Sequence, residues 1–325
     1  MNNFSSTIDL VGNTPLIKLK QASETTGCTI LGKAEFLNPG QSIKDRAALH
    51  MIMSAKNKDS TNKLIVEGTG GNTGIGLTVI GNALGYKTLI VMPENQSIEK
   101  INLLQNLGAK VVLTKQLPFS DPNNYIQLAK KLAKEKNAIW TNQFDNLANR
   151  EAHIKTTSQE IWKQTDGKVD AFICSVGTGG TLAGNYIGLK EKNKNIKVYC
   201  ADPYGSGMYS WIRKGKSKSS FSSITEGIGQ SRITKNLSGI NFDGAFKVHD
   251  KTALKIIYQL IHEEGLFLGP TSGINIGGAI KLAKKIGPNK IIVTVLCDGA
   301  DRYTSKIFNK AFLKTKNLNY EELNN

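Results

Sequence analysis

Alternation between short apolar runs and helical patterns constrains the fold of this chain more than any other feature. Segments with helical periodicity near residues 74–84, 98–107 and 125–134 separate apolar runs at residues 64–66, 88–92, 111–114 and 139–141. Strands joined by helices of about ten or more residues lie parallel, and helices cover both faces of a parallel sheet. The sequence therefore predicts a three-layer α/β unit.

The same alternation begins again after a break near residues 146–149. Helical patterns at residues 151–163, from residue 181, at 252–264 and at 274–286 accompany strand-like runs at 172–175, 198–201 and 291–296. The stretch 204–242 is rich in Gly, Ser and Lys, which predicts a long loop with short helices. We expect a second α/β unit here and a frayed tail over residues 318–325.

A Pro-Gly turn leads into a lysine at a predicted helix start. After Pro39-Gly40, the pattern predicts a helix from Lys44 to about Lys56. Unpaired N–H groups and a partial positive charge at a helix N-terminus disfavour an ammonium group. Schiff-base chemistry requires a neutral lysine amine. Lys44 is thus a candidate catalytic lysine, and the alternative is a solvated lysine at a helix start.

Two glycine-rich loops favour the catalytic interpretation. Residues 69–74 follow the apolar run 64–66, residues 177–181 follow the run 171–176, and each loop precedes a helical pattern. Such a loop presents backbone N–H groups and a helix N-terminus to an anion. Two anion sites and one activated lysine suggest a phosphorylated aldehyde cofactor and a substrate with a carboxylate.

Composition narrows the range of partners. The chain has 325 residues and a net charge of +16, but its lysines are spread over helix faces and loops with little aromatic interleaving. We therefore expect no nucleic-acid partner, only attraction of small anions. No apolar run is long enough for a membrane span and no signal-peptide layout is present, so we expect a cytoplasmic protein. The four cysteines lack metal-ligand spacing, so no metal site is expected.

At these motifs the chain resembles the cysteine synthase group of pyridoxal-phosphate enzymes, the fold-type-II or tryptophan-synthase-β-like family. The resemblance covers nearly the whole chain, and its motifs, in the family's order, lie at residues 11–16, 38–46, 69–74, 142–146, 177–181, 226–229, 269–273 and 298–303. This number of ordered motifs is far more specific than one glycine-rich loop.

The resemblance implies two three-layer α/β domains with the cofactor in the cleft between them. Residues 43–148 would form a smaller, mobile domain that carries the substrate-carboxylate loop. Residues 1–42 and 149–325 would form a larger domain that carries the phosphate-binding loop. A homodimer is also implied by the resemblance alone.

The resemblance further assigns residues to pyridoxal 5'-phosphate. Lys44 would form the imine with the cofactor and, once released by substrate, remove and return the Cα proton. Asn72 would contact the ring hydroxyl, and Thr271, with Ser272 as the alternative, would face the pyridine nitrogen. A neutral hydroxyl there does not keep the nitrogen protonated, which favours β-elimination. The phosphate would be bound by Gly177, Thr178, Gly179, Gly180 and Thr181.

Substrate-binding residues follow in the same way. The carboxylate would be held by Thr69, Gly70, Gly71, Asn72, Thr73 and Gln143, and Gly227 would line the mouth of the site. The sequence departs from the family at Gly70, where a serine is common, so one hydroxyl donor is lost and the substrate preference becomes open. Arg232 lies where many relatives have small or aromatic residues; it is either a reader of a second anionic group or a surface arginine.

The implied activity is β-replacement, in which O-acetylserine and sulfide give cysteine and acetate. Two related reactions stay open: cystathionine β-synthase chemistry with homocysteine, and an O-phosphoserine-dependent sulfhydrylase if Arg232 faces the pocket. A role of a different class is that of a cofactor-binding regulatory partner of serine acetyltransferase, whose C-terminal tail docks in the cleft of family members. Retention of Lys44 argues against an inactive protein but not against a double role.

Overall fold

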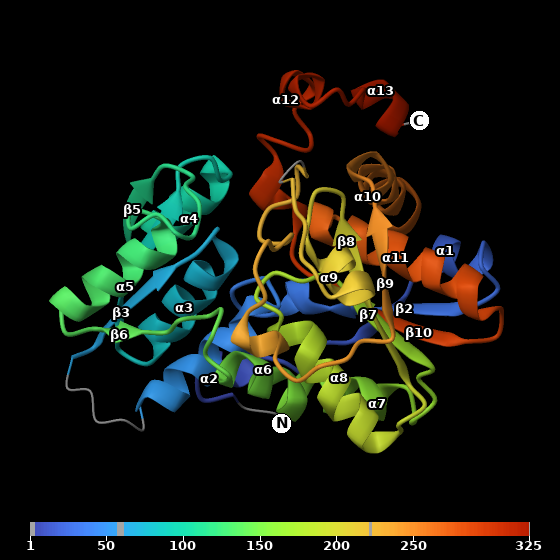
Figure 1. Cartoon of the computed structure of the whole chain (residues 1–325), viewed down its shortest axis with the longest axis horizontal. Helices are drawn as coiled ribbons and strands as arrows, with labels where there is room; N and C mark the ends of the chain where they lie inside the picture. The colour runs from blue at the N-terminus through green and yellow to red at the C-terminus, as the bar shows by residue number, and fades with distance from the viewer. Residues whose placement is uncertain (1–3, 57–61, 221–222, 325) are drawn as a thin grey trace.

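A computed structural model describes residues 4–56, 62–220 and 223–324 and shows two α/β units side by side (Figure 1). The smaller unit holds a four-stranded sheet in which every neighbouring pair is parallel. Its strand order is β5 (Lys110–Thr114), β4 (Lys87–Pro93), β3 (Leu64–Gly68) and β6 (Ile139–Trp140). The helices packed against this sheet include α2 (Lys44–Lys56), α3 (Asn72–Ala83), α4 (Ile98–Asn106) and α5 (Tyr125–Glu135). The predicted alternation of strands and helices is confirmed.

The larger unit holds a six-stranded sheet that combines the start and the end of the chain. Its order is β1 (Leu16–Lys18), β2 (Thr29–Ala34), β10 (Ile291–Leu296), β7 (Ala171–Cys174), β8 (Lys197–Pro203) and β9 (Gly244–Val248). Only the β1–β2 pair is antiparallel among these described strands. Because β2 and β10 are neighbours, the N-terminal arm is part of the larger sheet. The domain boundaries at residues 43 and 148 remain a prediction.

Helices cover both faces of the larger sheet, which explains its continuous apolar strands. Along β7, Ala171 and Ile173 join one core with α1 (Lys20–Glu24), α10 (Asp250–Glu264) and α11 (Pro270–Ile286). Phe172 and Cys174 point the other way, into a core formed with α7 (Ser158–Gln164), α8 (Gly180–Lys192) and α9 (Met208–Lys214). The three-layer prediction is therefore confirmed.

The predicted helix 151–163 is wrong in detail. It divides into α6 (Ala148–Ala152), a π-helical turn (His153–Thr157) and α7. Side-chain hydroxyls bond to main-chain oxygens four residues earlier, from Thr156 to Ala152 at 2.6 Å and from Ser158 to Ile154 at 2.7 Å. Such bonds compete with the helical ladder and accompany π-bulges. The short strands β1 and β9 were not predicted.

The tail also departs from expectation. Helices α12 (Lys310–Thr315) and α13 (Tyr320–Asn324) are formed; Leu323 is buried against the core and Glu322 pairs with Lys251 of α10. The prediction of a frayed tail is therefore wrong for residues 318–324, and residue 325 lies outside the described residues.

The 204–242 stretch is irregular, as predicted, with α9 and a short 3-10 helix, Lys235–Leu237. None of the described helices is long and apolar enough to cross a membrane.

A buried ion pair joins the two units. Lys100 of α4 lies 2.6 Å from Glu226, which belongs to the 204–242 stretch, and Lys306 bonds the other oxygen of the same carboxylate. The Lys100 ammonium also lies 4.1 Å from the centroid of the Tyr303 ring. Burial lowers the pKa of Lys100, although the charges of Glu226 and Asp298 oppose this effect. The Glu226 carboxylate thus neutralises two ammonium groups, one from each unit.

Removal of the Lys100 charge should therefore destabilise the fold. Lys100→Met leaves Glu226 with one cation, and loss of one partner of a buried pair typically costs about 3–5 kcal/mol. Urea unfolding of the apoprotein should show this loss. Lys131→Met is the control. Lys131 is 68% exposed, and its ammonium lies 3.9 Å from the Glu135 carboxylate, so this surface ion pair is long and solvated. Equal stabilities of the two variants would contradict a structural role for the Lys100–Glu226 pair.

Candidate active site

Four helix N-termini meet between the two sheets. Helix α2 (Lys44–Lys56) begins at Lys44, α3 begins at Asn72, α8 at Gly180 and α11 at Pro270. The last three follow the carboxyl ends of parallel strands, or a loop beside one, where ligands of open α/β sheets bind. Unpaired N–H groups and helix dipoles make such a cluster favourable for anions.

Asp298, which follows β10, ties three of these helix starts together. Its backbone forms a β-bridge with Ser42, and its main-chain oxygen accepts from the Gly269 N–H at 3.0 Å. Its carboxylate accepts from the amide of Asn72 at 2.6 Å, while Arg302 donates to the amide oxygen of Asn72 at 2.7 Å. Since both ends of the Asn72 amide are held, its orientation is fixed, with one N–H left to donate.

Cys297 places Lys44 beside the start of α11. Its main-chain oxygen accepts from the Ile43 N–H at 3.1 Å, and its own N–H donates to the Ser272 hydroxyl at 3.0 Å. The Thr271 hydroxyl, by contrast, has no hydrogen-bond partner among the described residues. This difference favours Thr271 over Ser272 as the hydroxyl available to a ligand. Lys44 is half-buried and makes no ion pair within the described part of the chain.

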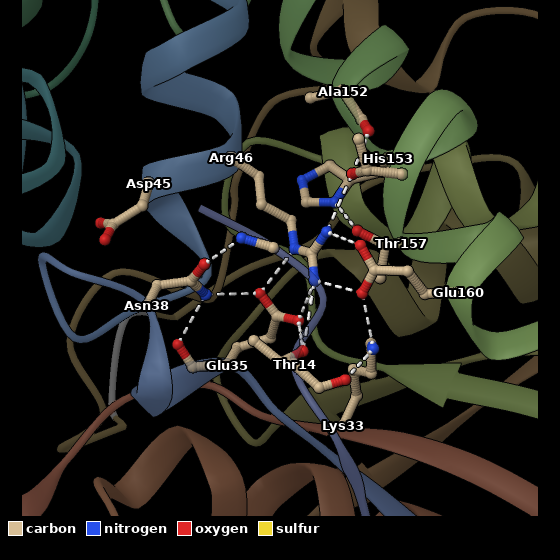
Figure 2. Close-up of polar contacts among 12 residues, drawn as sticks. Thr14, Lys33, Glu35, Asn38, Asp45, Arg46, Ala152, His153, Thr157 and Glu160 are labelled. Carbon is tan, nitrogen blue, oxygen red and sulfur yellow. Dashed lines mark hydrogen bonds and ion pairs between the residues drawn. The ribbon is translucent and has the colours of Figure 1, made fainter. Parts of the chain in front are cut away.

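A buried cluster of charges anchors the segment that carries Lys44 (Figure 2). Arg46 is 1% exposed and binds both oxygens of Glu35 at 2.8 Å and both oxygens of Glu160 at 2.6 and 2.7 Å. Lys33 binds Glu160 at 2.7 Å. Burial by itself would raise the pKa of Glu35, but the Arg46 guanidinium holds that pKa below its usual value. We call these two cations and two carboxylates the Arg46 cluster.

The Arg46 cluster also fixes the two loops next to it. Asn38 donates to Glu35 at 2.8 Å and accepts from the Gly12 N–H at 2.9 Å, while the Thr14 hydroxyl donates to Glu35 at 2.7 Å. The motifs at residues 11–16 and 38–46 thus contact each other directly through the Gly12–Asn38 bond and through Glu35. Lys44, two residues before Arg46, is held from both sides.

Glycines open the loop between β7 and α8. A Cβ atom at Gly177 would lie 2.3 Å from the main-chain oxygen of Gly227, and one at Gly180 would lie 2.1 Å from the Asn149 side chain. Gly179 has a φ of 88°, in the left-handed region. These positions exclude a side chain, so the backbone N–H groups at the start of α8 stay accessible to an anion.

The threonines of the same loop are held from behind. The Thr178 hydroxyl accepts from Asn149 at 2.8 Å, and the Thr181 hydroxyl lies 3.2 Å from Nε2 of His153. Burial lowers the pKa of His153 well below its ordinary value, and neighbouring cations add to this effect. A neutral imidazole, whose Nδ1 lies 2.9 Å from the Thr157 hydroxyl, therefore orients Thr181.

The loop at the start of α3 is joined to the segment after β6. The Thr73 hydroxyl donates to the Gln143 oxygen at 2.6 Å, and the Gln143 amide donates to the Gly68 main-chain oxygen at 2.9 Å. The Gly71 N–H donates to the Thr69 hydroxyl at 3.1 Å, and Gly71 has a φ of 131°, which only glycine adopts readily. The predicted carboxylate-binding residues are therefore brought together.

Gly70 has room for the serine common in the family. A Cβ atom there would lie 3.0 Å from Oε1 of Gln96, the far end of a flexible side chain. A small movement of Gln96 would admit the larger residue. The absence of a hydroxyl at this position is therefore a feature of this sequence and is not imposed by packing.

Arg232 is occupied by contacts of its own. Its guanidinium binds Asp145 at 3.2 Å and lies 4.3 Å from the centroid of the Phe119 ring and 5.4 Å from that of Phe144. These partners belong to residues 43–148, so Arg232 links the 204–242 stretch to the smaller unit. Because its guanidinium is already paired with Asp145, this arrangement does not support a role for Arg232 in binding a substrate phosphate.

Sequence reasoning missed the residues that hold the site from behind: Asp298, Arg302, Asn149 and His153. Asp298 and Arg302 lie inside a motif, but their contacts reach Asn72 across more than two hundred residues. No local pattern signals such a pairing. His153 is buried, and it contacts the predicted phosphate loop.

A phosphorylated ring cofactor fits this arrangement. The open backbone at the start of α8 suits a phosphate, the free Thr271 hydroxyl and the remaining Asn72 N–H suit the edge of a ring, and Lys44 supplies an amine. The substituents of a pyridoxal phosphate ring would each meet a matching group of the described residues.

Comparisons with known proteins agree with this fit. Residues 7–298 match the family model described as pyridoxal-phosphate dependent enzyme. Cysteine synthase 1 of Neurospora crassa is 49% identical over 316 residues, which is 95% of this chain and 84% of that protein. The chain therefore belongs to the pyridoxal-phosphate dependent enzyme family, of the fold-type-II cysteine synthase group, and pyridoxal 5'-phosphate is its cofactor.

Two solved structures are similar over nearly their whole length. An O-acetylserine dependent cystathionine β-synthase from Helicobacter pylori has a TM-score of 0.85 and 30% identity, covering 94% of this chain and 99% of that one. A hydrogen sulfide-producing enzyme from Fusobacterium nucleatum has a TM-score of 0.82 and 35% identity, covering 93% of this chain and 100% of that one. Both support the two-domain α/β fold.

A buried carboxyl group lies directly after Lys44. Asp45 has no exposed surface, and burial raises its pKa to about 7, although the Gly40 N–H and the charge of Arg302 oppose this shift. One of its oxygens accepts from the Gly40 N–H, and the other has no partner among the described residues. In the unfolded chain the pKa should return to about 3.9.

Asp45 should therefore make stability depend on pH. Between about pH 4 and 7 the folded protein binds a proton at Asp45 that the unfolded chain has lost, so the free energy of unfolding falls as pH rises, by up to about 1.4 kcal/mol per pH unit. Asp45→Asn should remove this component and still accept from Gly40. Urea unfolding at several pH values should show the stability of the wild type falling relative to that of the variant.

The exposed Asp166 provides a matched control, because Asp166→Asn makes the same chemical change at the surface. A constant stability difference between wild type and Asp45→Asn from pH 4 to 7 would contradict a protonated Asp45 in the folded state.

Proposed function

We propose that this chain is a cysteine synthase that converts O-acetylserine and sulfide into cysteine and acetate. The observation that carries the proposal is the convergence of Lys44 with two anion-binding helix starts, those of α3 and α8. One site suits the cofactor phosphate and the other suits an amino-acid carboxylate. The names of the relatives in Neurospora crassa and Helicobacter pylori support the same substrate class.

Each proposed cofactor contact uses groups that the fold leaves free. Gly177 to Thr181 and the N-terminus of α8 would bind the phosphate. Asn72, fixed by Asp298 and Arg302, would donate to the ring hydroxyl. Thr271 would face the ring nitrogen without protonating it, which favours loss of a β-substituent over a long-lived carbanion.

Substrate binding would use the N-terminus of α3. The N–H groups of Asn72 and Thr73, together with Thr69, Gly70, Gly71 and Gln143, would hold the α-carboxylate, with Gly227 at the mouth. The bound cofactor would supply an electron sink for charge that develops at Cα. The Lys44 amine would remove the proton from Cα of the substrate, and the same amine would later return a proton to Cα.

The domain division is part of the proposal. Residues 43–148 would move as the smaller domain against residues 1–42 and 149–325 and close over the substrate. The contacts of Arg232 with Asp145 and of Lys100 with Glu226 cross this division and would stabilise the closed arrangement. Closure would keep water from the reacting carbons.

A second candidate is a related β-replacement with another nucleophile or leaving group. The similarity to the Helicobacter pylori enzyme favours homocysteine as the alternative nucleophile, with cystathionine as product. An O-phosphoserine-dependent reaction is less favoured, because Arg232 is paired with Asp145.

Assembly and location are proposed on separate observations. Three apolar side chains are exposed at Leu10, at Met53 of α2 and at Leu147 directly before α6, and α2 contacts α6; this apolar surface supports a homodimer. The cysteines Cys28, Cys174, Cys200 and Cys297 are all free thiols, which supports location of the protein in a reducing compartment such as the cytoplasm. Docking of a serine acetyltransferase C-terminal tail in the cleft is proposed from the family resemblance.

Turnover assays with the purified protein test the reaction. O-acetylserine with sulfide should give cysteine and equimolar acetate. Addition of O-acetylserine alone should shift the visible absorption band of the bound cofactor, and later addition of sulfide should restore it. Lys44→Ala should abolish turnover, by at least about a hundredfold on the scale of proton-transfer catalysis, with an unchanged circular dichroism spectrum.

Parallel assays with O-phosphoserine, and with serine and homocysteine, distinguish the alternatives. If the enzyme turned over O-phosphoserine with sulfide, or serine with homocysteine, but did not turn over O-acetylserine, the proposed substrate would be contradicted. Binding of the acetyltransferase tail with no turnover of any pair would favour the regulatory role.

A further inference from the structure

A surface hollow of about 510 Å³ lies on the larger unit, away from the four helix starts. It is bounded by β8, β9, α9 and α11, near the open edge of the six-stranded sheet (Figure 1). Lys281 and Lys285 of α11 line it, whereas Thr271 lies in the first turn of the same helix. At 1.5 Å per residue, Lys281 is about 15 Å along the helix from Thr271. The hollow is thus separate from the candidate active site.

Four cations from three elements line this hollow: Arg213 of α9, Lys247 of β9, and Lys281 and Lys285 of α11. No carboxylate is among its lining residues. Within the described part of the chain, none of the four forms an ion pair. Like charges around a small volume repel one another, and an anion would relieve that repulsion.

Some lysines elsewhere in the larger unit pair with carboxylates. Lys190 and Lys197 both pair with Asp243, at 2.9 and 3.5 Å, and Lys290 pairs with Asp170 at 3.3 Å. The four cations of the hollow have no such ion pair among the described residues. The Lys281 ammonium donates to the main-chain oxygen of Lys247 at 2.6 Å. Burial raises the pKa of Asp202 to about 6, and the charge of Lys247 opposes this rise, so the carboxyl group near the hollow is a weak counter-charge.

Tyrosine side chains supply the rest of the polar surface. The hydroxyls of Tyr199, Tyr204 and Tyr209 make no hydrogen bond to any described residue. The Lys247 ammonium lies 5.2 and 5.3 Å from the Tyr204 and Tyr209 ring centroids, and the Lys285 ammonium lies 5.1 Å from that of Tyr199. These contacts place the cations against the walls. The lining presents mainly donors, and phosphate oxygens accept without donating.

We propose that this hollow binds a compound with several phosphate charges, such as an organic diphosphate or triphosphate. Four cations exceed what a monoanion would neutralise, and the volume lies within the range of small-molecule sites. The proposal does not rest on the proposed catalytic function, because no residue of the hollow belongs to the candidate active site.

Calorimetric titration of the cofactor-loaded protein tests the proposal, since bound pyridoxal phosphate keeps the other phosphate site filled. Pyrophosphate and ATP are the probes, at one fixed salt concentration. We expect saturable binding that Lys281→Glu/Lys285→Glu weakens by at least about tenfold, the scale of one charge-assisted hydrogen bond. Equal affinities for the two probes would show that the phosphates alone are bound; tighter binding of ATP would add the nucleoside to the ligand. Either result supports the site.

The control variant is Lys284→Glu/Lys314→Glu, which makes the same change in net charge at exposed positions outside the hollow. It should bind both probes within about twofold of the wild type, because only screened, long-range attraction is lost. No saturable binding of either probe, or equal weakening by the two double variants, would overturn the proposal. Tyr204→Phe should weaken binding without any change in charge, which separates a built site from general attraction.

Discussion

The contact of Arg46 with Glu35 and Glu160 is the interaction on which the candidate active site most depends. Isolated charges in a protein interior are costly, and a guanidinium with two carboxylates is tolerated only when every charge is paired. Arg46 meets that condition through bidentate bonds on both sides, and Lys33 balances the second carboxylate. The geometry leaves little freedom for the segment that carries Arg46.

Several parts of the fold follow from this requirement. Glu35 comes from the end of β2 and Glu160 from α7, so the Arg46 cluster clamps the N-terminal arm, the larger sheet and its covering helices together. Lys44 lies two residues before Arg46, and its position is inherited from the cluster. Asp298 then brings the starts of α3 and α11 to the same place, through Asn72 and Gly269. Anchoring by charge and convergence of helix N-termini together create the site.

Much of this could be predicted from the sequence, for identifiable reasons. The strands were found because both faces of each sheet are covered, so residues such as Phe172 and Ile173 are buried in succession. The glycines at 177, 179 and 180 were found because no side chain fits there. The Lys44 helix was found through its Pro-Gly turn.

The remainder depends on contacts between distant residues. The pairing of Asp298 with Asn72 spans 226 residues, and the π-helical turn at His153 arises from hydroxyls that bond backwards within one turn. Arg232 shows the same limit, because its partners Asp145 and Phe119 could not be known before the two units were placed together. Local patterns predict elements and loops, and tertiary contacts decide which groups stay free to bind.

The central claim is that the Arg46 cluster presents Lys44, and no other lysine, to the cofactor. Borohydride reduction of the cofactor-loaded protein, followed by proteolysis and mass spectrometry, tests it directly, because reduction makes the lysine–cofactor bond permanent. The account predicts a single pyridoxyl-modified peptide with the label on Lys44. A label on a buried lysine of another element, Lys33 or Lys100, would contradict it.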